Sequence, residues 1–113
     1  EELDIQLAGH LGTLLAVTDE LRAVAPSSDL DAAAERLAEQ VTRLRGGRKP
    51  ARASATTQGR DPNAAALHRR AHALSGRALV VAASRADTAA AILAAERMDA
   101  HSAALQPREL TSR

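Results

Sequence analysis

Two histidines four residues apart are the first residues whose spacing suggests chemistry. His68 and His72 belong to the segment HRRAH, and residues four apart lie on the same face of a helix. Zinc-dependent proteases hold their metal with two histidines at this spacing in the pattern HExxH, where the glutamate acts as general base. Here the glutamate is absent, and Arg69 and Arg70 between the histidines would repel a bound cation. We therefore expect no metal ion and no other cofactor, and keep His68 and His72 only as candidate ligands.

The other two histidines are interpreted as structural, although either could supply a further metal ligand. His10 falls on the apolar face of an expected first helix, where a hydrogen-bonded histidine at the edge of the core is the simplest interpretation. The alternative for His10 is a proton-responsive switch, because the unperturbed pKa of a histidine side chain is about 6.5. His101 falls near the end of the last expected helix, where the helix dipole favours a positive charge.

Positive charge is concentrated in residues 46–60, which read GGRKPARASATTQGR. The candidate phosphate contacts in this segment are Arg48, Lys49, Arg52 and Arg60, since Lys and Arg bind the nucleic-acid backbone without reading its sequence. The Gly, Ser and Thr content and Pro50 predict a loop. We favour a solvated loop over a nucleic-acid contact, because a short basic run is common on protein surfaces. The chain also has no aromatic residue that could stack on single-stranded bases.

No recognisable catalytic motif is present. Arg85, Glu96 and Asp99 are expected to project towards the same side of one helix, which indicates an ion pair more readily than a paired-carboxylate active site. The chain has no cysteine, and it lacks a Gly-rich phosphate loop, a nucleophile elbow and a zinc-binding pattern. Enzymatic function is therefore disfavoured.

The elements that must position these residues are helices. Alanine is abundant and has the highest helix propensity. Strands favour aromatic and β-branched residues, and the chain has no aromatic residue. Apolar residues at helical spacing predict a first helix over about 2–25, which Pro26 ends. A second helix is expected over about 29–45, with Ser28 as a capping residue and Gly46 and Gly47 at its end.

The third helical pattern begins at Asp61 and Pro62, a typical N-cap followed by proline at the first helical position. It continues to about residue 105, which is long for a globular helix. We expect two helices or a kink near 84–88, because Ser84 and Asp87 could each cap a new helix.

These elements predict an all-α protein with one helical-bundle domain over residues 1–113. The expected fold is an antiparallel three- or four-helix bundle, with the long basic loop 46–60 between the second and third helices. The main apolar stripe of the third pattern is expected to face the core. Its residues are Leu67, Ala71, Leu74, Ala78, Val81, Ala82, Ala89 and Ile92. A second side of small and apolar residues has no evident partner within the chain and predicts a subunit interface. Its residues are Gly76, Val80, Ala83, Ala90 and Ala94.

The sequence thus favours a non-enzymatic protein–protein interaction or regulatory module that self-associates as a homodimer. The alternatives are a nucleic-acid-associated regulator that uses the basic loop, and a bundle that binds a small ligand or a metal between its helices. No apolar run approaches the ~18 residues of a membrane span and no signal-peptide pattern is visible, so we expect no membrane partner and a cytoplasmic location. The single lysine among fifteen Lys and Arg residues, together with the many alanines, indicates a GC-rich, bacterial coding sequence.

Overall fold

Four α-helices follow one another in the computed structural model, which describes residues 2–52 and 63–106. They are α1 (Glu2–Val24), α2 (Ser28–Leu44), α3 (Ala64–Ser84) and α4 (Thr88–Ala104). The described residues contain no strand, and the predicted all-α bundle is confirmed in its four-helix form. Within the same residues, no helix has both the length and the hydrophobicity that crossing a bilayer requires.

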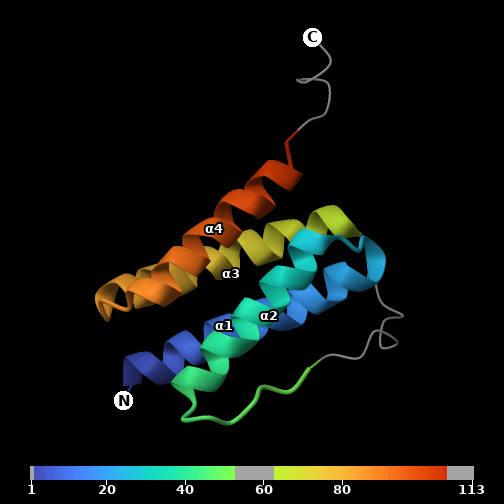
Figure 1. Cartoon of the computed structure of the whole chain (residues 1–113). Coiled ribbons are helices and arrows are strands. Elements are labelled where there is room, and N and C mark those ends of the chain that lie inside the picture. Colours follow the sequence, from blue (N-terminus) through green and yellow to red (C-terminus); the bar gives the residue numbers. More distant parts are fainter. Residues whose placement is uncertain (1, 53–62, 107–113) are drawn as a thin grey trace.

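The helices form two antiparallel hairpins, α1 with α2 and α3 with α4 (Figure 1). α1 packs against both α2 and α3, and α3 packs closely against α4, whereas α2 and α4 approach each other at few positions. Because no aromatic side chain is available, leucines provide most of the core volume, and α1 contributes most of them. The largest fully buried apolar side chains are Leu7, Leu11, Leu14, Leu15, Leu21, Leu37, Val17 and Val41.

Polar side chains cap the first turns of α2, α3 and α4. The Ser27 hydroxyl accepts a hydrogen bond from the Leu30 amide at 3.1 Å, so α2 is capped one residue earlier than predicted. The Asn63 side chain accepts from the Ala66 amide at 3.1 Å and caps α3. The predicted helix start at Asp61 and Pro62 lies outside the described residues.

α2 and α3 end in the same type of turn, with different residues at its left-handed position. After α2 this position is Gly46, with φ 68°, and the Gly47 amide donates to the Thr42 carbonyl at 2.8 Å. After α3 the position is Ala86, with φ 56°, and the Asp87 amide donates to the Ala82 carbonyl at 2.9 Å. Glycine adopts this conformation without strain, whereas for a residue with a side chain the conformation costs about 1 kcal/mol of folding free energy.

The predicted break in the third helical pattern is therefore a complete reversal of the chain. Asp87 is the N-cap of α4, and its carboxylate accepts from the Ala90 amide at 3.2 Å. The Arg43 guanidinium also donates to this carboxylate. Burial alone would raise the pKa of Asp87, but these hydrogen bonds outweigh burial and hold the pKa below its usual value. One residue thus begins α4 and ties it to α2.

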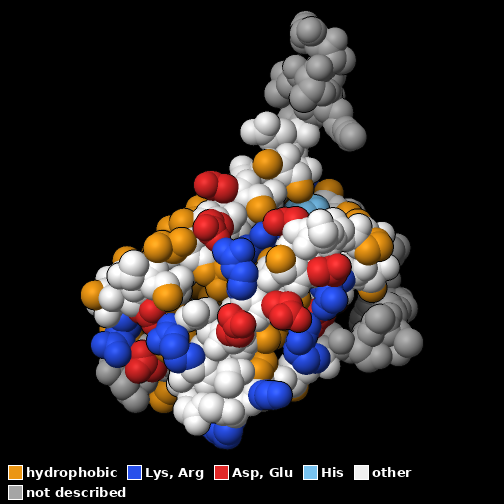
Figure 2. Space-filling view, viewed as in Figure 1, with side chains coloured by type: hydrophobic (Ala, Val, Ile, Leu, Met, Phe, Trp, Pro, Cys, Tyr) orange, Lys and Arg blue, Asp and Glu red, His pale blue; other side chains and the backbone are white. Residues whose placement is uncertain are grey.

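Ion pairs close the edge between α2 and α4, where the backbones stay apart. Arg43 pairs with Asp87 at 2.9 Å, Asp29 pairs with Arg97 at 3.2 Å, and Arg36 pairs with Glu96. The three α2 residues are seven positions apart and therefore lie on one side of that helix. We call these three pairs the charged edge; Figure 2 shows the alternation of basic and acidic side chains across the middle of this face.

Candidate functional site

The turn at Ala86 divides the predicted interface residues between two helices. Ala90 and Ala94 are fully buried inside the single chain, because α4 folds back onto α3. Gly76 is half-buried, and a Cβ placed on it would lie 3.8 Å from the Met98 sulfur. Val80 and Ala83 are exposed. The single face assumed for these five residues is therefore incorrect, because helical phase does not continue through the turn.

Two residues expected in the core stripe are exposed for the same reason. Ala89 and Ile92 would continue the Leu67–Ala82 stripe only if the helix were uninterrupted. In the hairpin both point away from the core, and Ile92 is 54% exposed. The core-facing positions of α4 are instead Ala90, Leu93, Ala94, Arg97 and His101.

Three large aliphatic side chains are exposed near the end of the bundle that contains the α3–α4 turn. Ile5 is 66%, Val80 67% and Ile92 54% exposed. The first turn of α1 lies beside the end of α3, because Arg85 pairs with Asp4 at 2.9 Å. Val80 and Ile92 are each five residues from the turn, or about 8 Å along a helix. We call Ile5, Val80 and Ile92 the aliphatic end; hydrophobic side chains gather on the α3–α4 hairpin in Figure 2.

A chain of hydrogen bonds connects two histidines and an arginine between α3 and α4. Nδ1 of His68 lies 2.8 Å from Nδ1 of His101, and Nε2 of His101 lies 3.4 Å from Nη2 of Arg97. His101 and Arg97 are buried, with 1% and 5% exposure, and His68 is half-buried. Nη1 of Arg97 donates to Asp29 at the start of α2. The cluster therefore joins three helices.

The arginine determines the protonation of both histidines. A guanidinium only donates hydrogen bonds, so Nε2 of His101 accepts. A neutral His101 then carries its proton on Nδ1 and donates it to Nδ1 of His68, which must accept. His68 consequently carries its own proton on Nε2. Burial, followed by the charge of Arg97 and the neighbouring His68, lowers the pKa of His101 to about 4. Burial and Arg97 also lower the pKa of His68.

This arrangement does not suit a metal ion. A metal bound at Nδ1 of His101 would leave its proton on Nε2, facing the donor groups of Arg97. The hydrogen-bond partner of His68 is His101 on α4. Among the described residues, no interaction joins His68 to His72. Within the described residues, no group of three or more His, Asp or Glu side chains lies close enough to hold a metal ion. The expected lack of a metal stays a prediction.

The candidate phosphate contacts occupy different surroundings. Nε and Nη2 of Arg52 each donate to the carboxylate of Asp19 at 2.9 Å. Arg48 donates to the Arg45 carbonyl at 3.4 Å, and Lys49 is exposed. Arg60 lies outside the described residues. A phosphate at Arg52 would have to displace Asp19, so Arg52 is a tether for the segment that follows α2.

Asp19 is the buried end of this tether. It is 8% exposed, and besides Arg52 it accepts from Arg22 at 2.9 Å. Burial alone would raise its pKa, but the bonds from Arg52 and Arg22 outweigh burial, and the pKa lies below its usual value. The tether fixes one wall of an open groove of about 520 Å³. Its lining residues are Glu35, Ala38, Glu39, Thr42, Arg43, Lys49, Pro50 and Arg52.

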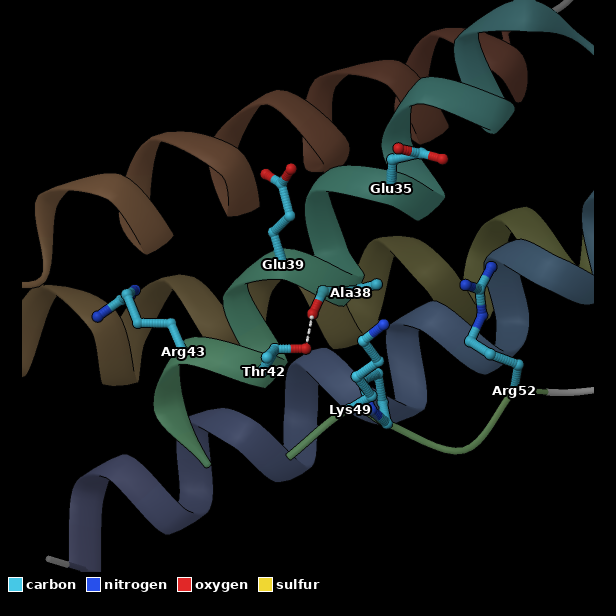
Figure 3. A pocket seen from close by; sticks show the side chains of 8 residues that line it. Glu35, Ala38, Glu39, Thr42, Arg43, Lys49 and Arg52 are labelled. Atoms are coloured by element: carbon cyan, nitrogen blue, oxygen red, sulfur yellow. Dashed lines mark hydrogen bonds between the residues drawn. The ribbon is translucent and has the colours of Figure 1, made fainter. Parts of the chain in front are cut away.

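The groove carries charges of both signs. Figure 3 shows Glu35 and Glu39 extending from α2, and Lys49 and Arg52 from the segment after it. Arg43 is held by Asp87 and Gln40, and Arg52 by Asp19. Because Arg43 and Arg52 are paired with carboxylates and Glu35 and Glu39 also line the groove, its lining does not favour a phosphate. The phosphate contacts expected from the basic loop stay a prediction.

The expected grouping of Arg85, Glu96 and Asp99 does not occur. Arg85 pairs with Asp4 on α1, Glu96 pairs with Arg36 on α2, and Asp99 is exposed. His10 is half-buried on α1. His101 was interpreted from the sequence as a structural residue near a helix end that favours a positive charge. It is buried, and its pKa is lowered.

Three buried polar residues were not placed in the core from the sequence: Arg97, His101 and Asp19. Arg97 and His101 continue the four-residue spacing of Leu93, which could have placed them on the core side of a separate α4. Asp19 lies one turn after the buried Leu15, on a side of α1 that the two-residue spacing from Val17 and Leu21 separates from their apolar stripe. Neither pattern identifies the partner, since Arg52 and Asp29 come from distant parts of the chain.

No protein-family model, no curated protein and no solved structure matches the chain.

Proposed function

We propose that this chain is a non-enzymatic protein–protein interaction module that self-associates through the aliphatic end. The observation that carries the proposal is the exposure of Ile5, Val80 and Ile92 at one end of the bundle. Large exposed aliphatic side chains gathered in one region mark interaction sites on soluble proteins more often than scattered ones do. Ala83, one turn after Val80, adds a small side chain that permits close approach.

A homodimer is the simplest assembly, because twofold pairing is the commonest arrangement of identical subunits. This proposal retains Val80 and Ala83 from the predicted interface and replaces the buried Ala90 and Ala94 by Ile92 and Ile5. It includes no cofactor and no catalytic step. The cytoplasmic location and bacterial origin expected from the sequence stay proposals of the same kind.

Sedimentation equilibrium of the whole chain tests the proposal. The double variant Val80→Glu, Ile92→Glu replaces two exposed aliphatic residues with a better helix former, so the fold is retained while the interface becomes charged. We expect the wild type to sediment as a dimer at tens of micromolar and the variant to associate at least tenfold more weakly.

The control variant is Val24→Glu. Val24 is 38% exposed and lies at the other end of α1, so this change adds one negative charge, half the charge of the double variant, away from the aliphatic end. Monomeric wild-type protein at tens of micromolar would overturn self-association, and so would equal weakening by the Val24 variant. Circular dichroism establishes that all three proteins are equally helical.

A further inference from the structure

The outer face of α3 carries three arginines that the fold does not use. Arg69, Arg70 and Arg77 are exposed, and within the described part of the chain none of them forms an ion pair. Other arginines of the same part pair with acids across the bundle. Those arginines are Arg22, Arg36, Arg43, Arg52, Arg85 and Arg97.

α3 has no acidic residue to balance this charge. Its sequence from Ala64 to Ser84 contains neither Asp nor Glu, whereas α1, α2 and α4 each contain acids. The positions three and four residues from each of the three arginines are held by Ala, Leu, His or Val, so no stabilising i,i+4 pair is available.

The spacing of the three arginines is regular. Arg70 and Arg77 are seven residues apart, so they point within about 20° of one another and are separated by about 10 Å along the axis. Arg69 and Arg77 are eight residues, or about 12 Å, apart, with exposed Ala73 midway between them. The small side chain of Ala73 lets a charged partner approach the helix between the arginines.

We propose that this face of α3 binds the phosphate backbone of duplex nucleic acid without sequence preference. The 10–12 Å between its arginines corresponds to about three phosphate steps of one strand, at about 3.4 Å per step along the duplex. Arginine forks suit phosphate oxygens. The surrounding alanines offer no group that reads base edges, and without aromatic residues the chain cannot stack single-stranded bases.

An anionic membrane is the other polyanion that such a face could meet. Peripheral helices also insert large apolar side chains into the lipid, and around these arginines the exposed side chains are alanines. Val80, near the end of the helix, is the large aliphatic residue on this side. The composition of the face therefore favours phosphates presented in solution. The inference differs from the basic-loop interpretation, because its arginines are on α3. Arg77 lies one turn before Val80 of the aliphatic end, so the test also follows the assembly of the variant.

The test compares two charge-matched triple variants. Fluorescence anisotropy measures binding of a labelled random-sequence 20-base-pair DNA duplex at 50–200 mM salt. The first variant is Arg69→Gln, Arg70→Gln, Arg77→Gln; the second is Arg45→Gln, Arg48→Gln, Lys49→Gln, which removes the same charge after α2.

We expect micromolar binding by the wild type at 50 mM salt and at least tenfold weaker binding by the first variant. The slope of log K against log salt should fall by about 2–3 in that variant, and the second variant should change affinity less than threefold.

Three outcomes would overturn the proposal. The first is no binding of the duplex by the wild type at 50 mM salt. The second is equal weakening by the two variants, which would make the effect one of net charge. The third is binding to vesicles containing phosphatidylserine in place of the duplex. Because glutamine is a good helix former, the first variant should unfold at the same urea concentration as the wild type or slightly higher, and sedimentation checks that its assembly is unchanged.

Discussion

Nε2 of His101 lies 3.4 Å from Nη2 of Arg97, so a buried imidazole in this protein faces a permanent positive charge. The contact is compatible only with a neutral His101. Adding a proton to Nε2 would remove its acceptor and place two cations together between α3, α4 and the start of α2. The stability of the fold therefore depends on the protonation state of His101.

The first prediction concerns acid stability. The pKa of His101 is about 4 in the folded chain and about 6.5 when unfolded, so the unfolded chain binds the extra proton first as pH falls. The stabilisation is complete above about pH 6.5 and is lost as pH falls towards 4. It amounts to about 3 kcal/mol, of which about 2 kcal/mol is lost by pH 5.

Urea unfolding followed by circular dichroism at pH 7, 6 and 5 measures this loss. In His101→Gln, the amide oxygen can accept from Arg97 and the amide nitrogen can donate to His68, but the side chain does not titrate. We expect its stability to change much less over this range. His10→Gln is the control and should retain the wild-type pH dependence. A wild type equally stable at pH 7 and pH 5 would contradict the prediction.

The second prediction uses the two similar turns. Ala86 has φ 56°, so Ala86→Gly should raise the free energy of unfolding by about 1 kcal/mol through relief of backbone strain. Gly46, with φ 68°, is the reciprocal case, and Gly46→Ala should lower the free energy of unfolding by a similar amount. Thermal and urea unfolding of both variants compare them directly. Destabilisation by Ala86→Gly would show that the turn is not strained.

The third prediction concerns the Asp19 tether. Asp19→Asn keeps the shape of the side chain but removes the charge that holds Arg52, and we expect a loss of about 2 kcal/mol. Tryptic cleavage after Arg52 should accelerate, because this segment loses its attachment to α1. Asp31→Asn is the control, since Asp31 binds Arg22 with its side chain 59% exposed and should matter by less than about 0.5 kcal/mol. Equal cleavage rates for wild type and Asp19→Asn would refute the tether.

The helices could be predicted because their signals are local. Pro26 cannot continue a helix and the pair Gly46 and Gly47 favours a helix end, and the break before Asp87 follows from its capping side chain. The residues on each face after the break could not be predicted, because the geometry of the Ala86 turn resets the helical phase. As a result Ala94 lies in the core in place of Ile92, and two of the five predicted interface residues, Ala90 and Ala94, are buried.

The candidate sites were predicted less well, because they depend on contacts between distant residues. His68 was selected for its spacing from His72, yet its hydrogen-bond partner is His101 on another helix. Arg52 was selected for its charge, and that charge is neutralised by Asp19 on α1. Residue spacing shows which side chains share a face of one helix. Which side chains that face contacts depends on how the helices pack against one another.

The charged edge between α2 and α4 has a consequence for how the molecule opens. Apolar packing joins the hairpins along α1 and α3, whereas ion pairs with partly exposed partners hold the opposite edge, and exposed pairs weaken as salt rises. The hairpins should therefore separate about the α1–α3 contact as a hinge, with water reaching Leu37 and Leu93 first. Amide hydrogens of α2 and α4 would then exchange before those of α1, at an energy below that of global unfolding.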